Sequence, residues 1–535
     1  MKRGKDIEMN VLTRIGKCIY QLGLTVLCGL GLLLLGLLSL STLLVSYYAE
    51  DMETQVSLPH QDPLFLQLLG VLCAAGLMLL ISRLCRRNLR RWKRLLLLFS
   101  CLWIMGWGIY LILVGKTIPS ADAASVYNIA ESMAGNNLGV IHPTDSYLSY
   151  YPQQMGLCAF YEIVVRVWNL LSIPFPAYHI LKCINVFCAC LILYSQYRIT
   201  HLCFQSDRAD ILYLLLAAFH APLTMYTSFV YGEIPSFALF SLGTWLLLSA
   251  VMEQVRPRLL LPVSAALLIF SAALRKNTLI LIIAVCIALL WEWLRTHRHS
   301  LLLYGLCLML GSLSILPAIQ SIYEHRAGNT LNDGVPAISY FAMGMQEASR
   351  GSGWYNGYNF YTYQDTGMDT LATVSISKQA IRQRLEDFRK DPEYAFTFYR
   401  DKFLSQWTDG SCFCRQATLA SATERTGFLA AVYTGSLAGA FMQFCNLWQA
   451  VIYIFAWLCL ICTIRRQRRA GCAGMSFLFY VGLIGVLGGF LFHMIWEANS
   501  RYIFPYALLL LPYAAGGLHA VGAWLTDRMG NRKTR

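Results

Sequence analysis

Long apolar stretches recur along the whole chain, and short polar or basic segments separate them. About twelve stretches come close to or exceed the roughly 20 residues that an α-helix needs to cross a bilayer. The predicted spans are 17–47, 63–82, 95–115, 178–199, 210–229, 235–252, 258–273, 277–294, 301–322, 443–464, 474–495 and 502–524. The pattern therefore predicts an all-α polytopic membrane protein.

Composition and charge agree with this fold class. The 535 residues are 57% hydrophobic and 13% charged, whereas soluble domains carry about 25% charged residues. The basic excess, 43 Lys and Arg against 29 Asp and Glu, lies in short clusters at 83–94, 295–298, 465–469 and 528–535. This distribution follows the positive-inside rule and predicts contact with membrane lipids, not nucleic-acid binding. It predicts cytoplasmic N- and C-termini in a multi-pass protein of a cell membrane, most simply a bacterial plasma membrane.

The cysteines do not form a disulfide or zinc pattern. Most of the 18 lie inside apolar spans, where they act as small apolar residues. Cys412 and Cys414 fall in a predicted outward loop, but a single intervening residue makes a bridge between them strained. We therefore predict no structural metal and no cofactor, and a metal requirement for activity stays open.

Two long segments between spans are predicted to lie outside. They run over 116–177 and 323–426, and the second is long enough to be a small domain. The apolar stretches 156–172 and 427–443 are interpreted as interfacial helices, because counting them as spans would move 295–298 to the outside. Glu162 and Arg166 in the first stretch are spaced to pair along a helix.

This topology divides the chain into four parts. They are 1–92, an N-terminal hairpin with a basic loop; 93–322, a core that contains the loop 116–177; 323–426, the outward domain; and 427–535, an interfacial helix and three spans. Within the outward domain we expect a helix over 377–390. Asp391 and Pro392 then have the residue types of a second helix start, with that helix reaching Trp407.

Asp122 is the first residue of chemical interest. It opens a predicted helix that reaches Met133 in the first outward loop. Asp is a common helix N-cap, and a carboxylate is also a usual general base, so both roles stay open. Glu131 and Asp145 are the other acids of this loop, and we expect them to be solvated.

Three outward cations break the positive-inside pattern. Arg275 and Lys276 occupy one very short turn, and Arg501 occupies another. Cations held at the membrane surface suit a lipid phosphate; the alternative is snorkelling or an ion pair such as Arg501 with Glu497. Glu233, in a further short turn, is a second acid, a partner for Arg275 or Lys276, or a simple turn residue.

Aromatic side chains are concentrated in both outward segments. Tyr150 and Tyr151 precede Pro152, and the glycine-rich run 351–361 contains Trp354 and Tyr355. Such rings can stack against sugars or the sugar acceptor. Aromatic residues near a membrane surface are also ordinary interfacial residues.

These pieces in this order resemble the GT-C glycosyltransferases. The similarity covers about 93–535 and involves the Asp122 loop, the segments 150–154, 231–235, 275–277, 353–357 and 402–407, and Arg501-Tyr502. It is closest to the branch of protein O-mannosyltransferases and lipid A aminoarabinose transferases, and within it to uncharacterised bacterial members. The first two spans look like an added hairpin.

The resemblance implies that Asp122 acts as the base and that a polyprenyl-phosphate sugar is the donor, with inversion at the anomeric carbon as the usual outcome. Some members have adjacent acids in this loop, whereas Asp122 is flanked by Ala121 and Ala123.

The expected function is transfer of a sugar from a polyprenyl phosphate to a protein, lipid or cell-envelope glycan at the outer membrane face. Arg275, Lys276 and Arg501 are then the candidates for binding the donor phosphate. The alternative is a transporter or flippase for a lipid-linked or small polar substrate. Charged or broken spans at matching places in two halves of the chain would favour that alternative.

Overall fold

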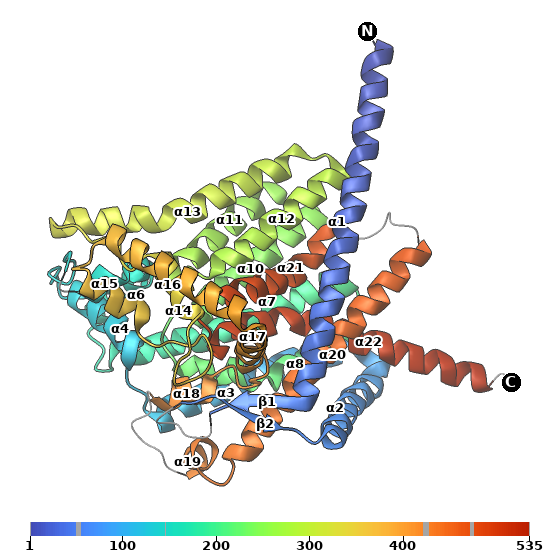
Figure 1. The fold of residues 1–535 in the computed structure, drawn as a ribbon. Coiled ribbons are helices and arrows are strands. Elements are labelled where there is room, and N and C mark those ends of the chain that lie inside the picture. Colours follow the sequence, from blue (N-terminus) through green and yellow to red (C-terminus); the bar gives the residue numbers. More distant parts are fainter. Residues whose placement is uncertain (1, 50–54, 145, 421–426, 471–475, 534–535) are drawn as a thin grey trace.

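Long helices packed against one another make up most of the molecule (Figure 1). The computed structural model describes residues 2–533 except 50–54, 145, 421–426 and 471–475. The long helices are α1 (Lys2–Leu44), α2 (Leu64–Leu84), α3 (Leu89–Gly115), α7 (Ala177–Phe204), α10 (Glu233–Met252), α11 (Pro257–Leu274), α12 (Thr278–Thr296), α13 (His299–Ala327), α20 (Ala438–Ala470), α21 (Val481–Ile495) and α22 (Phe504–Lys533). α10 packs on α7 and α11, and α20 packs on α1 and α22.

Helices able to span a membrane account for the predicted segments. Within the described residues, ten runs are long and apolar enough to cross a bilayer, and a bent pair raises the number to 11. One of the ten, Leu64–Gly115, contains both α2 and α3, separated by the 3-10 turn η1 (Cys85–Asn88). Because α2 and α3 are each long enough to cross alone at 1.5 Å per residue, every predicted span coincides with a helix or with the bent pair.

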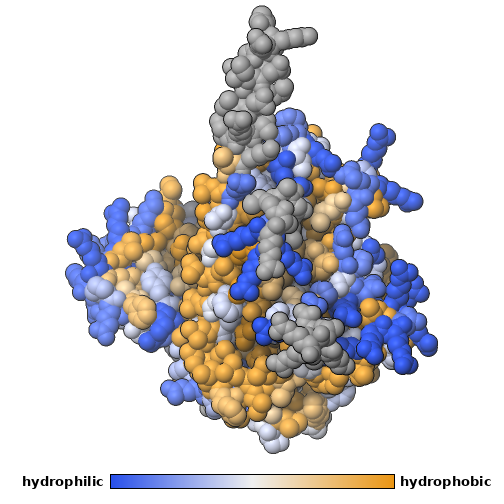
Figure 2. All heavy atoms as spheres, turned by 90° about the vertical axis from the view of Figure 1, so that its right-hand side faces the viewer, coloured by the Kyte–Doolittle hydropathy of each residue, from blue (hydrophilic) through white to orange (hydrophobic). Residues whose placement is uncertain are grey.

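The surface of these helices is apolar where a bilayer would contact it. Figure 2 shows a broad hydrophobic area in the middle of one face, with hydrophilic atoms at its sides. Leu33 of α1 is 72% exposed and Leu72 of α2 is 68% exposed. An exposed apolar surface of this extent is unusual for a soluble protein. The chain is thus a multi-pass α-helical membrane protein.

The predicted span over 210–229 is not one straight helix. α8 (Asp207–Ala218) is followed by α9 (Ala221–Met225) and the 3-10 turn η3 (Tyr226–Ser228), with a bend of 59° between them. Pro222 cannot donate a backbone hydrogen bond, and its ring disfavours helical geometry in the residue before it. The helix therefore stops at Ala218 and restarts at the proline.

Short helices gather at one end of the long ones, beside the Ala327 end of α13 (Figure 1). In the first loop they are α4 (Ala121–Ala134), α5 (Tyr147–Tyr150), the 3-10 turn η2 (Pro152–Gln154) and α6 (Met155–Leu170). In the second they are α14 (Ala337–Gly344), α15 (Tyr358–Asp365), α16 (Thr370–Lys390), α17 (Pro392–Trp407) and α18 (Cys414–Ala420), and α19 (Gly427–Tyr433) follows that loop. The 3-10 turns η4 (Phe477–Tyr480) and η5 (Ser500–Ile503) precede α21 and α22.

A small antiparallel hairpin joins the N-terminal helices to this region. β1 (Val45–Tyr48) pairs with β2 (Leu58–Gln61), with Val45 opposite Gln61. β1 packs against α17, and the Tyr47 hydroxyl donates to Asp401 Oδ1 at 3.3 Å. The first two helices are thereby connected to the predicted outward domain.

Two local expectations are confirmed and one is wrong. The Asp391 carboxylate accepts from the Tyr394 amide at 2.9 Å and Pro392 opens α17; Arg166 Nε lies 2.8 Å from Glu162 Oε1. The stretch 427–443 is not one helix, because α19 ends at Tyr433 and α20 has begun by Ala438. Cys412 and Cys414, predicted in an outward loop, are buried free thiols, because the segment between α17 and α18 packs into the interior; on which side of the membrane this segment lies stays a prediction.

Candidate functional site

Asp122 is the second residue of α4 and lies seven residues after Gly115, the last residue of the span α3. Ser120 occupies the N-cap position, so the N-cap interpretation of Asp122 is wrong, although the carboxylate still lies where the helix dipole stabilises negative charge. Its side chain is exposed. The Tyr231 hydroxyl donates to Asp122 Oδ2 at 3.4 Å. Asp122 is thus an accessible carboxylate tied to the rest of the protein through Tyr231.

Contacts with α7 and with the end of η3 fix the segment that leads into α4. The buried Lys182 ammonium donates to the Thr117 carbonyl at 2.5 Å, and the Thr117 hydroxyl donates to the Ser228 carbonyl at 3.3 Å. These bonds hold the loop before α4 against the segment that carries Tyr231. The two parts of the site are positioned by the same buried polar contacts.

Tyr231 lies at the centre of the site. Its hydroxyl accepts from Gln154 Nε2 at 2.8 Å, and its ring lies 4.9 Å from the Arg275 guanidinium carbon and 5.3 Å from that of Arg501. Burial, and then the neighbouring Asp122 charge, raise the pKa of Tyr231 well above its ordinary value. The phenol therefore stays protonated and can donate to Asp122 at neutral pH.

Glu233 connects the two arginines. Its Oε1 lies 2.9 Å from Arg275 Nη2 and 3.5 Å from Arg501 Nε, and all three side chains are largely buried. Of the partners expected for these groups, Arg275 pairs with Glu233 as anticipated. Arg501 pairs with Glu233 and has no ion pair with Glu497 within 4.0 Å in the described residues. Glu233 stands directly after Gly232, whose φ of +89° favours glycine.

A pocket opens beside these charges. It lies between the ends of α10, α12, α21 and α22, and its polar lining includes Glu233, Arg275, Asn277, Arg501 and Tyr502. Lys276 is exposed on the same turn as Arg275 and is not part of this lining. The pocket presents two buried guanidinium groups and one carboxylate. This arrangement suits an anionic ligand.

Glu497 is an acid that the sequence analysis considered only as a partner for Arg501. It is 8% exposed and accepts from the Tyr502 hydroxyl at 3.3 Å. Burial raises the pKa of Glu497 to about 7, the nearby Asp122 charge also raises it, and Arg501 opposes the shift. The Asp122 charge is therefore close enough to influence the ionisation of Glu497. The missed signal was its place in a short turn between two spans, like Glu233.

Backbone hydrogen bonding beside Glu497 fixes the position of this residue. The amide of Ala498 donates to the Gly353 carbonyl at 2.7 Å, and Trp354 and Ala498 form an isolated parallel bridge. The glycine-rich segment of the predicted outward domain is thus attached to the turn between α21 and η5.

The predicted aromatic contacts lie in two different environments. Trp354 is 1% exposed and donates from Nε1 to the Ser405 hydroxyl at 3.0 Å, while Tyr355 is 42% exposed. Tyr150 packs on Phe360 with ring centroids 4.7 Å apart. Burial raises the pKa of Tyr151, as do Tyr355 and then Asp122, so Tyr151 and Tyr355 border the acid site. Whether any of these rings contacts a sugar stays a prediction.

The other acids of the first loop are not brought into this site. Glu131 is exposed and accepts from the Tyr127 hydroxyl at 3.3 Å on the same helix. Asp145 lies outside the described residues. Among the acids near Tyr231, Asp122 is the one with an exposed carboxylate.

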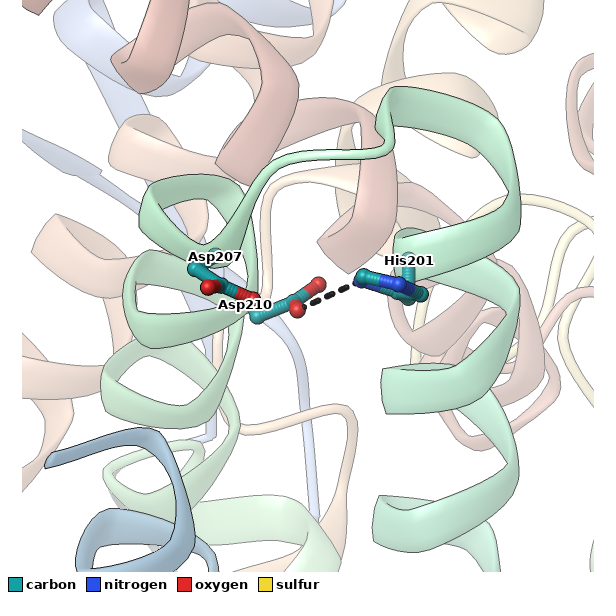
Figure 3. Close-up of side chains that lie close together, drawn as sticks. All are labelled: His201, Asp207 and Asp210. Atoms are coloured by element: carbon teal, nitrogen blue, oxygen red, sulfur yellow. Dashed lines mark hydrogen bonds and ion pairs between the residues drawn. The ribbon is translucent and has the colours of Figure 1, made fainter. Parts of the chain in front are cut away.

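A second polar cluster lies toward the other end of α7. His201, Asp207 and Asp210 offer potential metal-ligand atoms within 4.8 Å of one another, and Figure 3 shows Asp210 of α8 directed toward His201 of α7. His201 Nδ1 lies 2.8 Å from Asp210 Oδ2. The Lys93 ammonium also contacts both aspartates, with Nζ 3.0 Å from Asp210 Oδ2. A lysine thus already supplies a positive charge to this cluster.

Comparisons with known proteins include a structural likeness to a solved membrane protein. No protein-family model matches the chain, and no curated protein sequence matches it. In its fold the chain is similar to the oligosaccharyltransferase of Archaeoglobus fulgidus in the apo form, with 12% identity and a TM-score of 0.45. The alignment covers 83% of this chain and 52% of the archaeal chain, so this chain spans about half of that enzyme's length. A likeness of this size assigns neither a family nor an activity.

Proposed function

We propose that this chain is a membrane glycosyltransferase of the GT-C type that moves a sugar from a polyprenyl-phosphate donor to an acceptor. The observation that carries the proposal is that Tyr231 contacts both the acid and the two arginines of the site. Its hydroxyl binds the exposed Asp122 carboxylate, while its ring lies against the guanidinium groups of Arg275 and Arg501. The proposed base, Asp122, and the two arginines proposed to bind the phosphate thus contact the same side chain, Tyr231.

The proposed reaction uses these groups in separate roles. Asp122 takes the proton from an acceptor hydroxyl or amine, and the acceptor atom then attacks the anomeric carbon. The bond between that carbon and the phosphate oxygen breaks, and both of its electrons stay with the phosphate. Arg275 and Arg501 stabilise the negative charge that develops there, and Lys276 contributes at the pocket mouth. No bound metal or cofactor is part of this proposal.

Orientation of the two substrates would supply much of the rate. Glu233 and Tyr231 hold the arginines in place before any ligand binds. Such pre-organised charges need little rearrangement during the reaction. The proposal places this site at the outer face of a cell membrane, as the positive-inside pattern predicts.

Replacement of Asp122 tests the assignment of the base. We expect Asp122→Asn to reduce transfer by at least about a hundredfold, the lower end of typical general-base contributions, while sugar-donor binding stays unchanged. Transfer is measured with a radiolabelled polyprenyl-phosphate sugar and a membrane acceptor pool. The matched control is Glu131→Gln, which removes an exposed acid from the same helix. Near-normal transfer by Asp122→Asn would refute this role.

A further inference from the structure

The pocket beside Tyr231 contains an unusual charge arrangement. One carboxylate, Glu233, lies between two guanidinium groups, at 2.9 Å from Arg275 and 3.5 Å from Arg501. Asp122, Lys276 and Glu497 do not line this pocket. The two guanidinium groups and the one carboxylate of its lining therefore sum to about one net positive charge.

The Glu233 carboxylate is held by charge more than by hydrogen bonds. In the described part of the chain, neither of its buried oxygens accepts a well-aligned hydrogen bond, and Arg501 Nε likewise has no acceptor with good geometry. Burying a carboxylate whose oxygens accept no hydrogen bond destabilises the fold. Such a residue is expected to be kept when it has a function that outweighs this cost. Its value to the protein is therefore expected to lie in its charge.

The proposed reaction changes the charge of the lipid. A polyprenyl-phosphate sugar is a phosphodiester with a single negative charge. After the bond to the anomeric carbon breaks, the lipid carries a phosphomonoester, whose charge near pH 7 is about −1.5 to −2. Two arginines without Glu233 would bind this more negative product more tightly than the substrate. Tight product binding would slow turnover.

We propose that Glu233 sets the charge of the pocket so that it holds a lipid phosphodiester while limiting the preference of the two arginines for the corresponding phosphomonoester. This inference rests on the proposed function and extends it from the reaction to the release of its product. Glu233 is a specificity-determining residue and not a second base. It offsets one of the two guanidinium charges and so weakens the hold on the doubly charged product.

Two lipid probes that differ by one methyl group test the inference. They are a short polyprenyl phosphate and its methyl ester, and their Kd values are measured on the purified full chain in detergent. In the unmodified protein we expect the Kd values of the methyl ester and the monoester to lie closer together than in Glu233→Gln. In Glu233→Gln we expect the monoester to gain about tenfold relative to the methyl ester, because one opposing charge is lost at close range.

Three control variants separate this role from a structural one. Glu233→Asp keeps the charge and should keep the ratio of the two Kd values. Glu292→Gln removes another buried, arginine-paired glutamate, at the opposite end of α12, and should also leave the ratio unchanged. Glu233→Ser removes the charge with a smaller side chain, and it should reproduce the shift if Glu233→Gln fails to fold.

The outcomes distinguish this inference from the proposed function. An unchanged ratio in both Glu233→Gln and Glu233→Ser, or an equal shift in Glu292→Gln, would overturn the inference and leave the proposed transferase intact. Arg275→Gln and Arg501→Gln variants that bind both lipids normally would overturn the phosphate site itself. Displacement of both lipids by inorganic phosphate at comparable concentration would assign the pocket to a soluble anion and also overturn the inference.

Discussion

At the scale of single residues, the site depends on three turns that meet around Tyr231. Arg275 comes from the turn between α11 and α12, Arg501 from η5, and Asp122 from the start of α4. The two arginines are held by a shared ring and a shared carboxylate. Because Tyr231 contacts both the acid and the cations, changing only its hydroxyl should separate the two functions.

Tyr231→Phe provides this separation. The ring that supports Arg275 and Arg501 stays, while the hydrogen bond to Asp122 is lost. Since hydrogen bonds to charged groups contribute about 1.5–3 kcal/mol, we expect kcat to fall about tenfold or more and the KM for the sugar donor to stay within about twofold. Tyr127→Phe is the matched control, because that hydroxyl binds the exposed Glu131 on the same helix. A raised KM with normal kcat would contradict this role.

Glu497 should make binding of the sugar donor depend on pH. Its pKa of about 7 means that a second carboxylate ionises beside Asp122 and Arg501 as the pH rises through 7. We expect the Kd for a lipid phosphodiester to increase by about threefold or more between pH 6 and pH 8, because the added charge opposes an anion. Glu497→Gln should remove this dependence. A pH dependence that survives in Glu497→Gln would assign it to another group.

The raised pKa of Glu497 also makes the stability of the folded protein depend on pH. The pKa of Glu497 is raised above the ordinary value of 4.5, so the folded protein binds this proton more tightly than the unfolded chain does. The resulting stabilisation is fully present below about pH 4.5 and is lost as the pH rises through about 7. The stabilising form is thus the neutral carboxyl, as its burial requires.

At the scale of helices, the sequence predicted the start of a helix well where neighbouring residues alone determine it. Asp391 and Pro392 mark the start of α17 because capping and a fixed φ need only neighbouring residues. The predicted span over 210–229 missed the bend of 59°, since apolar content there is continuous and only Pro222 interrupts the backbone bonding. The break at Tyr433 was missed for a similar reason, because apolar residues continue from α19 into α20.

The candidate site was only partly predictable from the same signals. Cations in short turns were visible because they break the charge pattern of the loops. The contact between Glu233 and Arg501 and the position of Glu497 were not, because they depend on how turns far apart in the sequence pack together, and Glu233 and Arg501 are more than 200 residues apart. A linear pattern can place each turn at a membrane face, but it does not determine which side chains meet there.

At the scale of the whole molecule, the two polar clusters lie toward opposite ends of the same helix. Lys182, which positions the loop before Asp122, and His201, which pairs with Asp210, are both on α7. Their separation along the helix is about 28 Å at 1.5 Å per residue, close to the thickness of a hydrocarbon core. The clusters therefore mark the two faces of the membrane-spanning part, and the orientation decides which face carries the proposed chemistry.

Epitope tags at two exposed turns would measure this orientation. The positive-inside pattern predicts that Gly367, between α15 and α16, lies outside and that His297, between α12 and α13, lies inside. In intact spheroplasts we expect an antibody to bind a tag inserted at Gly367 and to reach a tag at His297 only after permeabilisation. The untagged chain controls for antibody specificity, and a known cytoplasmic protein controls for leakage. The reverse labelling would move Asp122, Arg275 and Arg501 to the cytoplasmic face and exclude sugar transfer at the outer face.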